Sequence, residues 1–240
     1  MPLFEHDGVK IYYEEYGKGF PILLISPGGM RSTISFWEKT PWNPITQLSS
    51  TYRVIAMDQR NAGQSVAPIR ATDSWHVYTQ DQLALLDHLG VDRFHVAGMC
   101  IGGPYCMGLI QAAPKRVASA VLFQTIGLSN NREAFFEMFD GWGKELQQTR
   151  SDVSKEALES FKNNMYGGDF LFNVSQEFVS RCTTPLLVLL GNDLYHPQET
   201  SREIAKLAPN ATLIENWKEP EHQPAAKQAV ERFLAEHTPR

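Results

Sequence analysis

Five short apolar runs constrain the fold of this 240-residue chain more than any other feature of its sequence. They lie at residues 22–25, 54–57, 94–97, 117–123 and 186–190. Runs that are apolar at nearly every position are typical of strands buried on both faces of a parallel sheet. Segments of helical pattern separate or follow them, at 81–89, 104–113 and 225–235. The sequence therefore predicts an α/β fold with a mostly parallel, doubly wound sheet, preceded by a β-hairpin around Asp7–Gly8.

Residues 128–182 interrupt this alternation, because they show helical patterning and no convincing strand. Phe135, Met138, Phe139 and Trp142 are spaced as one face of a helix. A second helical stretch covers residues 155–164. We expect the segment 128–182 to be a helical lid, inserted into a single-domain core that residues 1–127 and 183–240 form.

Charge and apolar content argue against several classes of partner. The formal net charge is −5, and the charged residues form no basic stripe, so we expect no nucleic-acid partner. No apolar stretch approaches the roughly 20 residues of a membrane span, so we expect no membrane partner. The first residues lack the basic start and apolar core of a signal peptide. Because the cysteines are odd in number (Cys100, Cys106 and Cys182), we expect free thiols and a cytoplasmic location.

The motif with the most direct chemical meaning is Gly-Met-Cys-Ile-Gly-Gly at residues 98–103. It follows an apolar strand and precedes a helix, which is the context of a nucleophile elbow. Its glycines permit a sharp turn, and Cys100 should project from the sheet edge at a helix N-terminus, where negative charge is stabilised. The pKa of this thiol should therefore be lowered. The alternative is a small buried cysteine in a glycine-rich turn, the role we expect for Cys106 and Cys182 in the core.

Together with three other motifs, this elbow resembles the α/β-hydrolase fold superfamily, over nearly the whole chain. Residues 26–30 correspond to the family's loop that supplies part of an oxyanion hole, and residues 191–193 to the strand end that carries its acid. Residues 58–65 match its Asp-x-Arg-Gly-x-Gly-x-Ser loop, in which we expect Asp58 and Arg60 to satisfy neighbouring backbone groups. The chain departs from the family pattern at Pro27, Asn61 and Cys100, where histidine, glycine and serine are common. The Gly-x-Cys-x-Gly-Gly pattern is similar to the elbow of dienelactone hydrolases, which use a cysteine, aspartate and histidine triad.

The resemblance implies a nucleophile, an acid and a histidine in that order along the chain, and Cys100, Asp193 and His222 fit it. Asp193 follows the apolar run 186–190, and His222 lies between a strand at 211–214 and the final helix. The alternatives are a turn or capping aspartate at 193 and an exposed loop histidine at 222. His196 is the rival base. We rank it second, in a substrate-contacting or structural role, because the order of elements favours His222.

An oxyanion hole needs two N–H donors aimed at the developing charge, and we expect the backbones of Ile101 and Gly29 to supply them. The residues expected around the substrate are Met30, Met99, His196, Phe135, Phe139 and Trp142. The three aromatic side chains fit a role in packing equally well. We expect no metal and no cofactor, because no Cys and His cluster has metal spacing and residues 98–103 are not a dinucleotide fingerprint.

These features predict a hydrolase for a small-molecule acyl substrate, namely a carboxylic ester, an enol-lactone or a thioester. The acyl group would pass to Cys100 as a thioester, and water activated by His222 would release it. Acyl transfer to an alcohol or amine is an alternative, as is a ligand receptor or a lyase on the same fold. An engineered cysteine in place of a serine is a further alternative at position 100.

Overall fold

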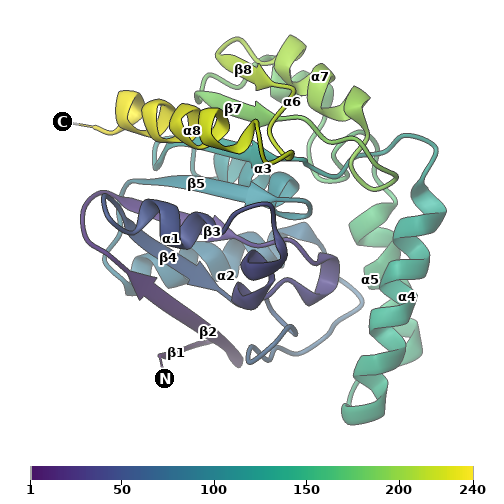
Figure 1. Cartoon of the computed structure of the whole chain (residues 1–240). Helices are drawn as coiled ribbons and strands as arrows, with labels where there is room; N and C mark the ends of the chain where they lie inside the picture. The colour runs from purple at the N-terminus through teal and green to yellow at the C-terminus, as the bar shows by residue number, and fades with distance from the viewer. Residues whose placement is uncertain (1, 240) are drawn as a thin grey trace.

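A computed structural model describes residues 2–239, in which an eight-stranded sheet has helices on both faces (Figure 1). The strands are β1 (Leu3–His6), β2 (Val9–Tyr16), β3 (Pro21–Ile25), β4 (Arg53–Met57), β5 (Phe94–Met99), β6 (Val117–Phe123), β7 (Leu186–Leu189) and β8 (Ala211–Ile214). Their spatial order is β1-β2-β4-β3-β5-β6-β7-β8. The pairs from β4 to β8 are parallel, whereas β1 with β2 and β2 with β4 are antiparallel. The predicted sheet and the predicted hairpin are both confirmed.

The helices divide between the two faces of the sheet. The α-helices are α1 (Pro44–Leu48), α2 (Trp75–His88), α3 (Gly102–Ala112), α4 (Arg132–Thr149), α5 (Lys155–Tyr166), α6 (Gln176–Ser180), α7 (Gln198–Leu207) and α8 (Gln223–His237), and the 3-10 helices are η1 (Gly29–Arg31) and η2 (Ile34–Lys39). Buried side chains of α2, α3 and α7 join one core cluster, and those of α1 and α8 join the other. Figure 1 shows α8 in front of the sheet and α3 behind it.

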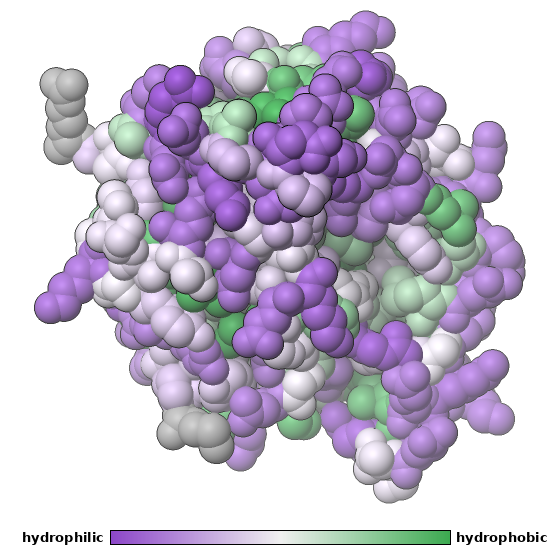
Figure 2. Space-filling model, viewed as in Figure 1, coloured by the Kyte–Doolittle hydropathy of each residue, from purple (hydrophilic) through white to green (hydrophobic). Residues whose placement is uncertain are grey.

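The continuous apolar runs in the sequence arise because both faces of each central strand are covered. In β4, Val54 and Ala56 pack toward α1 and α8, while Ile55 and Met57 pack toward α2 and α3. All four side chains are fully buried. The surface is different in character, and Figure 2 shows one face as mostly hydrophilic, with hydrophobic residues in small separate patches. Burial of these strands on both sides supplies the main driving force for the fold.

The segment 128–182 contains α4, α5 and α6 and lies beyond the carboxyl ends of the central strands (Figure 1). Its helices are held together by aromatic side chains, since Phe161 of α5 packs edge-on against Phe139 and Trp142 of α4. An ion pair of 2.8 Å between Arg31 of η1 and Glu145 of α4 joins the segment to the core. The predicted helices at 135–142 and 155–164 are confirmed, and the segment is attached to the core close to β3.

The loop 58–65 supports the same edge of the sheet. The Asp58 carboxylate accepts the backbone N–H groups of Ile34 and Gln64, each at 2.9 Å, as predicted. Arg60 differs from its predicted role, because its guanidinium donates to both carboxylate oxygens of Asp81, at 2.7 and 2.9 Å, rather than to backbone groups. Both side chains are buried, so each charge depends on the other for its stabilisation.

Candidate active site

Cys100 occupies the turn between β5 and α3, with a left-handed backbone (φ of 61°). Its carbonyl accepts the N–H groups of Gly103 and Ile126, at 3.1 and 3.2 Å, which fixes this strained conformation. Glycine is required two positions after it, because a Cβ on Gly102 would lie 2.6 Å from the carbonyl oxygen of Ile25. The predicted elbow is therefore present, with Cys100 at its tip.

Asp193 and His196 belong to one tight turn that follows β7. The Asp193 carboxylate accepts the backbone N–H groups of Tyr195 and His196, each at 3.1 Å. The His196 ring folds back on the same carboxylate, with Nδ1 at 2.7 Å from Oδ1 and 2.8 Å from Oδ2. The turn needs a glycine before it, because a Cβ on Gly191 would lie 2.4 Å from the His196 carbonyl oxygen. The local sequence thus holds an imidazole against a carboxylate.

The other side of the His196 ring faces Cys100. Its Nε2 atom is buried and makes no conventional hydrogen bond within residues 2–239, whereas Nδ1 is taken by Asp193. Burial alone would lower the pKa of His196, but its hydrogen bond with Asp193 and its interaction with the nearby Cys100 raise it to about 9. Burial would raise the pKa of the Cys100 thiol, yet the proximity and positive charge of His196 lower it on balance. Opposite shifts of this kind favour a thiolate and imidazolium pair.

Asp193 completes the electrostatic arrangement. Its hydrogen bond with His196 outweighs burial and lowers the pKa of the carboxyl group to about 2. A carboxylate that stays ionised at neutral pH both orients the imidazole and stabilises its charged form. Three groups in the order Cys100, His196 and Asp193 therefore form one connected unit.

His222 is not part of this unit, which corrects the predicted arrangement. It lies directly before α8, where its backbone N–H donates to Glu219 and its carbonyl accepts from Ala226. Its side chain makes no hydrogen bond to the part of the chain that the structure describes, and it does not line the cavity beside Cys100. The physical reason is that both oxygens of Asp193 are already engaged by its own turn. The rival residue, His196, lies between Asp193 and Cys100 instead.

Two backbone N–H groups approach the Cys100 sulfur, those of Gly28 and Ile101, and both lower the pKa of the thiol. Ile101 is the donor that the sequence predicts. The other N–H that approaches the sulfur is that of Gly28, one position before the predicted donor Gly29. Gly29 lines the same cavity. Donors placed in this way suit a negative charge that develops next to the sulfur.

A cavity of about 230 Å³ opens beside the sulfur. Its lining residues are Gly28, Gly29, Cys100, Ile101, Ile126, Phe135, Met138, Tyr166, Tyr195 and His196. Apart from the two tyrosine hydroxyls and the reactive groups, this lining is apolar. A volume below the roughly 300 Å³ of pockets for drug-sized ligands indicates a small ligand.

The predicted substrate residues divide between this cavity and the core. Phe135 and His196 line the cavity. Phe139 and Trp142 pack in the interior of segment 128–182, and Met99 is buried on the α8 side of the sheet. Met30 is buried as well, and its sulfur accepts the Tyr166 hydroxyl. Sequence reasoning missed Ile126, Met138, Tyr166 and Tyr195 as lining residues, although Met138 lies on the same predicted helix face as Phe135.

The comparison with known proteins agrees with this geometry. Residues 21–160 match the family described as alpha/beta hydrolase fold. The chain belongs to this family. Like the fold, the elbow at Cys100 and the acid-bearing turn after a late strand are features expected of an alpha/beta hydrolase.

Curated relatives of this alpha/beta hydrolase carry several different names. A putative carbamate hydrolase RutD from Azorhizobium caulinodans is 35% identical over 51% of this chain, but the match covers only 43% of that relative. A 2-hydroxymuconate semialdehyde hydrolase from Pseudomonas putida is 25% identical over 95% of this chain and 92% of its own length. Among solved structures, an enol-lactonase from Burkholderia xenovorans has a TM-score of 0.71 at 20% identity, covering 98% of this chain and 100% of its own. The structural likeness establishes the fold.

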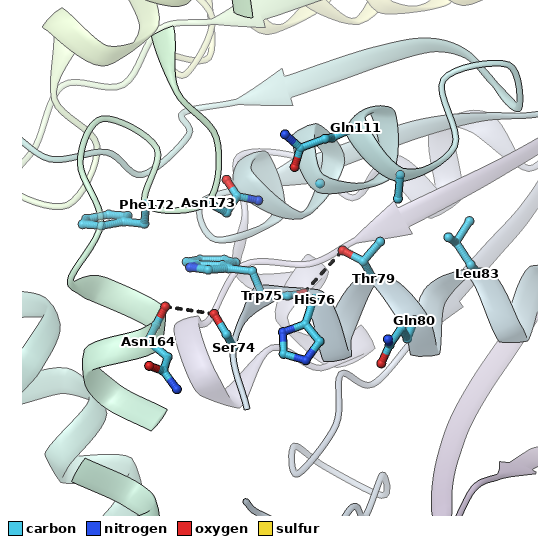
Figure 3. Close-up of a pocket in the computed structure, with 12 residues that line it drawn as sticks. Ser74, Trp75, His76, Thr79, Gln80, Leu83, Gln111, Asn164, Phe172 and Asn173 are labelled. Carbon is cyan, nitrogen blue, oxygen red and sulfur yellow. Dashed lines mark hydrogen bonds between the residues drawn. The ribbon is translucent and has the colours of Figure 1, made fainter. Parts of the chain in front are cut away.

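A second depression of about 430 Å³ lies between α2, α3 and the loop after α5 (Figure 3). Trp75 and Phe172 line it and also pack against Tyr166, at ring distances of 5.9 and 5.4 Å, so these rings stand between this depression and Cys100. Its Ser74 hydroxyl donates to the Asn164 carbonyl at 2.9 Å.

Within residues 2–239, no group of three or more His, Cys, Asp or Glu side chains is placed to hold a metal ion. Nor is any described helix long and apolar enough to cross a membrane.

Proposed function

We propose that this alpha/beta hydrolase cleaves a small carboxylic ester, enol-lactone or thioester, with Cys100 as nucleophile, His196 as acid and base, and Asp193 as the group that orients His196. One observation carries the proposal: Asp193 holds the His196 ring through Nδ1 at 2.7 Å, which leaves Nε2 for Cys100. The lowered pKa of the thiol and the raised pKa of the imidazole support the same roles.

In the first step, the Cys100 thiolate attacks the acyl carbon and forms a carbon–sulfur bond. The carbonyl oxygen becomes negatively charged, and we assign its stabilisation to the N–H groups of Gly28 and Ile101, which approach the sulfur. When the tetrahedral intermediate collapses, the bond to the leaving oxygen or sulfur breaks. His196 gives its Nε2 proton to that leaving group, and the acyl group remains as a thioester on Cys100.

In the second step, His196 is neutral and accepts a proton from a water molecule that attacks the thioester carbon. Collapse of this intermediate breaks the carbon–sulfur bond and releases the carboxylic acid. The sulfur leaves as thiolate, and His196 keeps the proton, so the initial ion pair is restored. Asp193 keeps its charge throughout and stabilises the imidazolium at the start and end of the cycle.

Size and polarity of the cavity support a small, largely apolar acyl group. Phe135, Met138 and Tyr166 come from the segment 128–182, which we propose acts as a lid over Cys100.

Intact-protein mass spectrometry during turnover of a nitrophenyl ester tests the proposal. The wild-type chain should gain the mass of one acyl group transiently, and the Cys100→Ala variant should neither gain it nor hydrolyse the ester. Cys106→Ala is the matched control, because that buried thiol has a pKa raised to well above 9 and should not react. Unchanged hydrolysis by a folded Cys100→Ala variant would show that another group attacks the substrate.

A further inference from the structure

Tyr166 is a fully buried phenol that lines the same cavity as Cys100. It is the last residue of α5, and its ring is fixed on several sides. Phe135 stacks on it at 5.2 Å, and Phe172 and Trp75 contact it edge-on. Because these rings leave the phenol little freedom, its hydroxyl has a defined position, against the Met30 sulfur.

Among residues 2–239, the hydroxyl of Tyr166 has no strong hydrogen-bond acceptor. Its hydrogen bond runs to the Met30 sulfur at 3.6 Å, and a thioether is a weak acceptor. A buried hydroxyl without a good acceptor is costly, so an oxygen brought by a ligand would replace the sulfur with a gain in free energy. The hydroxyl remains a donor at working pH, because burial and then the charges of Tyr78 and Cys100 raise its pKa well above 10.

The other polar groups of the cavity already have roles. The N–H groups of Gly28 and Ile101 approach the sulfur, and His196 is the proton carrier of the proposed reaction. The Tyr195 hydroxyl is directed to the Ala134 carbonyl oxygen, at 3.5 Å. Tyr166 therefore supplies the donor that remains for a second oxygen of the substrate.

We infer that Tyr166 selects the substrate, by donating a hydrogen bond to an acceptor oxygen (hydroxyl, keto or ether) in the acyl group, close to the scissile carbonyl. The inference rests on the proposed function, since it assumes an acyl group on Cys100. That group stays bound to the sulfur through both steps, whereas the leaving group departs. In a cavity of about 230 Å³, its first few atoms lie within the space that Cys100 and Tyr166 share.

Two esters with the same nitrophenyl leaving group test this inference, a butanoate and a methoxyacetate, which differ by one methylene replaced with oxygen. The measured quantity is the ratio of kcat/KM for the methoxyacetate to that for the butanoate. Comparing this ratio between variants cancels the intrinsic reactivity of each ester. Tyr166→Phe should lower the ratio about three- to tenfold, the effect of one neutral hydrogen bond. Tyr105→Phe, which removes another buried phenolic oxygen outside the cavity, should leave the ratio unchanged.

A second variant covers the case in which Tyr166→Phe does not fold. Met30→Leu keeps the volume and removes the competing acceptor, so it should raise the ratio. An unchanged ratio in the folded Tyr166→Phe variant would overturn the inference, and if both esters then lost activity equally, Tyr166 would have a structural role. If the folded wild type hydrolyses neither ester, the proposed function fails and the inference fails with it, a result distinct from the other two.

Discussion

Asp193 and His196 are three positions apart in one turn, and the imidazole Nδ1 of His196 lies 2.7 Å from Oδ1 of Asp193. The acid and the base of the site therefore come from the same loop. The turn orients both groups at once, because backbone N–H groups at 195 and 196 hold the same carboxylate that binds the ring. No second loop has to become ordered to bring a histidine to Asp193.

The two histidines should separate clearly in mutant kinetics. We expect His196→Ala to lower kcat by about a hundredfold or more, because it removes the group that moves the proton in both steps. His222→Ala should change kcat less than a few-fold, since within the described residues its side chain makes no hydrogen bond and does not line the cavity beside Cys100. Steady-state hydrolysis of a nitrophenyl ester measures both. A larger loss of kcat in His222→Ala than in His196→Ala would instead identify His222 as the base, as the sequence predicts.

The pH dependence of kcat/KM should be bell-shaped, with a limb for each partner of the ion pair. Activity should rise with pH as Cys100 ionises, at a pH below the ordinary thiol pKa. It should fall as pH passes about 9, where His196 loses its proton. Asp193→Asn removes the carboxylate that raises the pKa of His196, so the falling limb should move to lower pH. An alkaline limb that stays in place would mean that another group titrates there.

Stability should depend on the buried ion pair between Arg60 of the loop 58–65 and Asp81 of α2. Asp81→Ala leaves the Arg60 guanidinium buried, with Asp73 at 3.9 Å as its nearest remaining carboxylate. We expect a loss of about 3 kcal/mol or more in the free energy of unfolding, measured by urea denaturation. Asp152→Ala is the control, because it breaks an exposed pair with Arg150 and should barely move the midpoint. Equal midpoints for the two variants would contradict this account.

The strands and the nucleophile could be predicted because their physical causes are local in the sequence. Burial on both faces leaves continuous apolar runs, and the close approach of Gly102 to Ile25 leaves a glycine at a fixed position after Cys100. Helix α7 was not predicted from the sequence. Two of its three buried residues, Thr200 and Ser201, are polar, so its buried face carries few of the apolar residues by which a helix is predicted. The Ser201 hydroxyl is buried because it accepts the N–H of Gly191.

The base could not be predicted from the order of elements alone. His196 and His222 both follow late strands, and the sequence does not say which ring turns toward Cys100. That outcome depends on the geometry of the turn from Asp193, and on the absence of a side chain at Gly191. The useful signal was an aspartate followed by histidine at the third position, after a glycine and before a proline.

The last prediction concerns the leaving group and follows from the chemistry of sulfur. A thiolate is a good nucleophile and a good leaving group, so a tetrahedral intermediate with a poor leaving group returns to thiolate and substrate. Turnover therefore needs a group that departs well, such as a phenol, an enol or another thiol. We expect kcat/KM to fall steeply along a series of esters with rising leaving-group pKa, and simple alkyl esters and amides to be poor substrates.

Rapid mixing with the same esters decides whether the thioester is hydrolysed. With activated esters, we expect a burst of one leaving group per Cys100, followed by continued release, because His196 can activate water once it has given up its proton. A single burst with a stable acyl adduct would show that the acyl group is trapped, as in a ligand receptor. Continued release that speeds up when an alcohol or amine is added would show acyl transfer instead. If kcat/KM did not change with leaving-group pKa, departure of the leaving group would not control the rate. Departure from the tetrahedral adduct on sulfur is the step most sensitive to the leaving-group pKa.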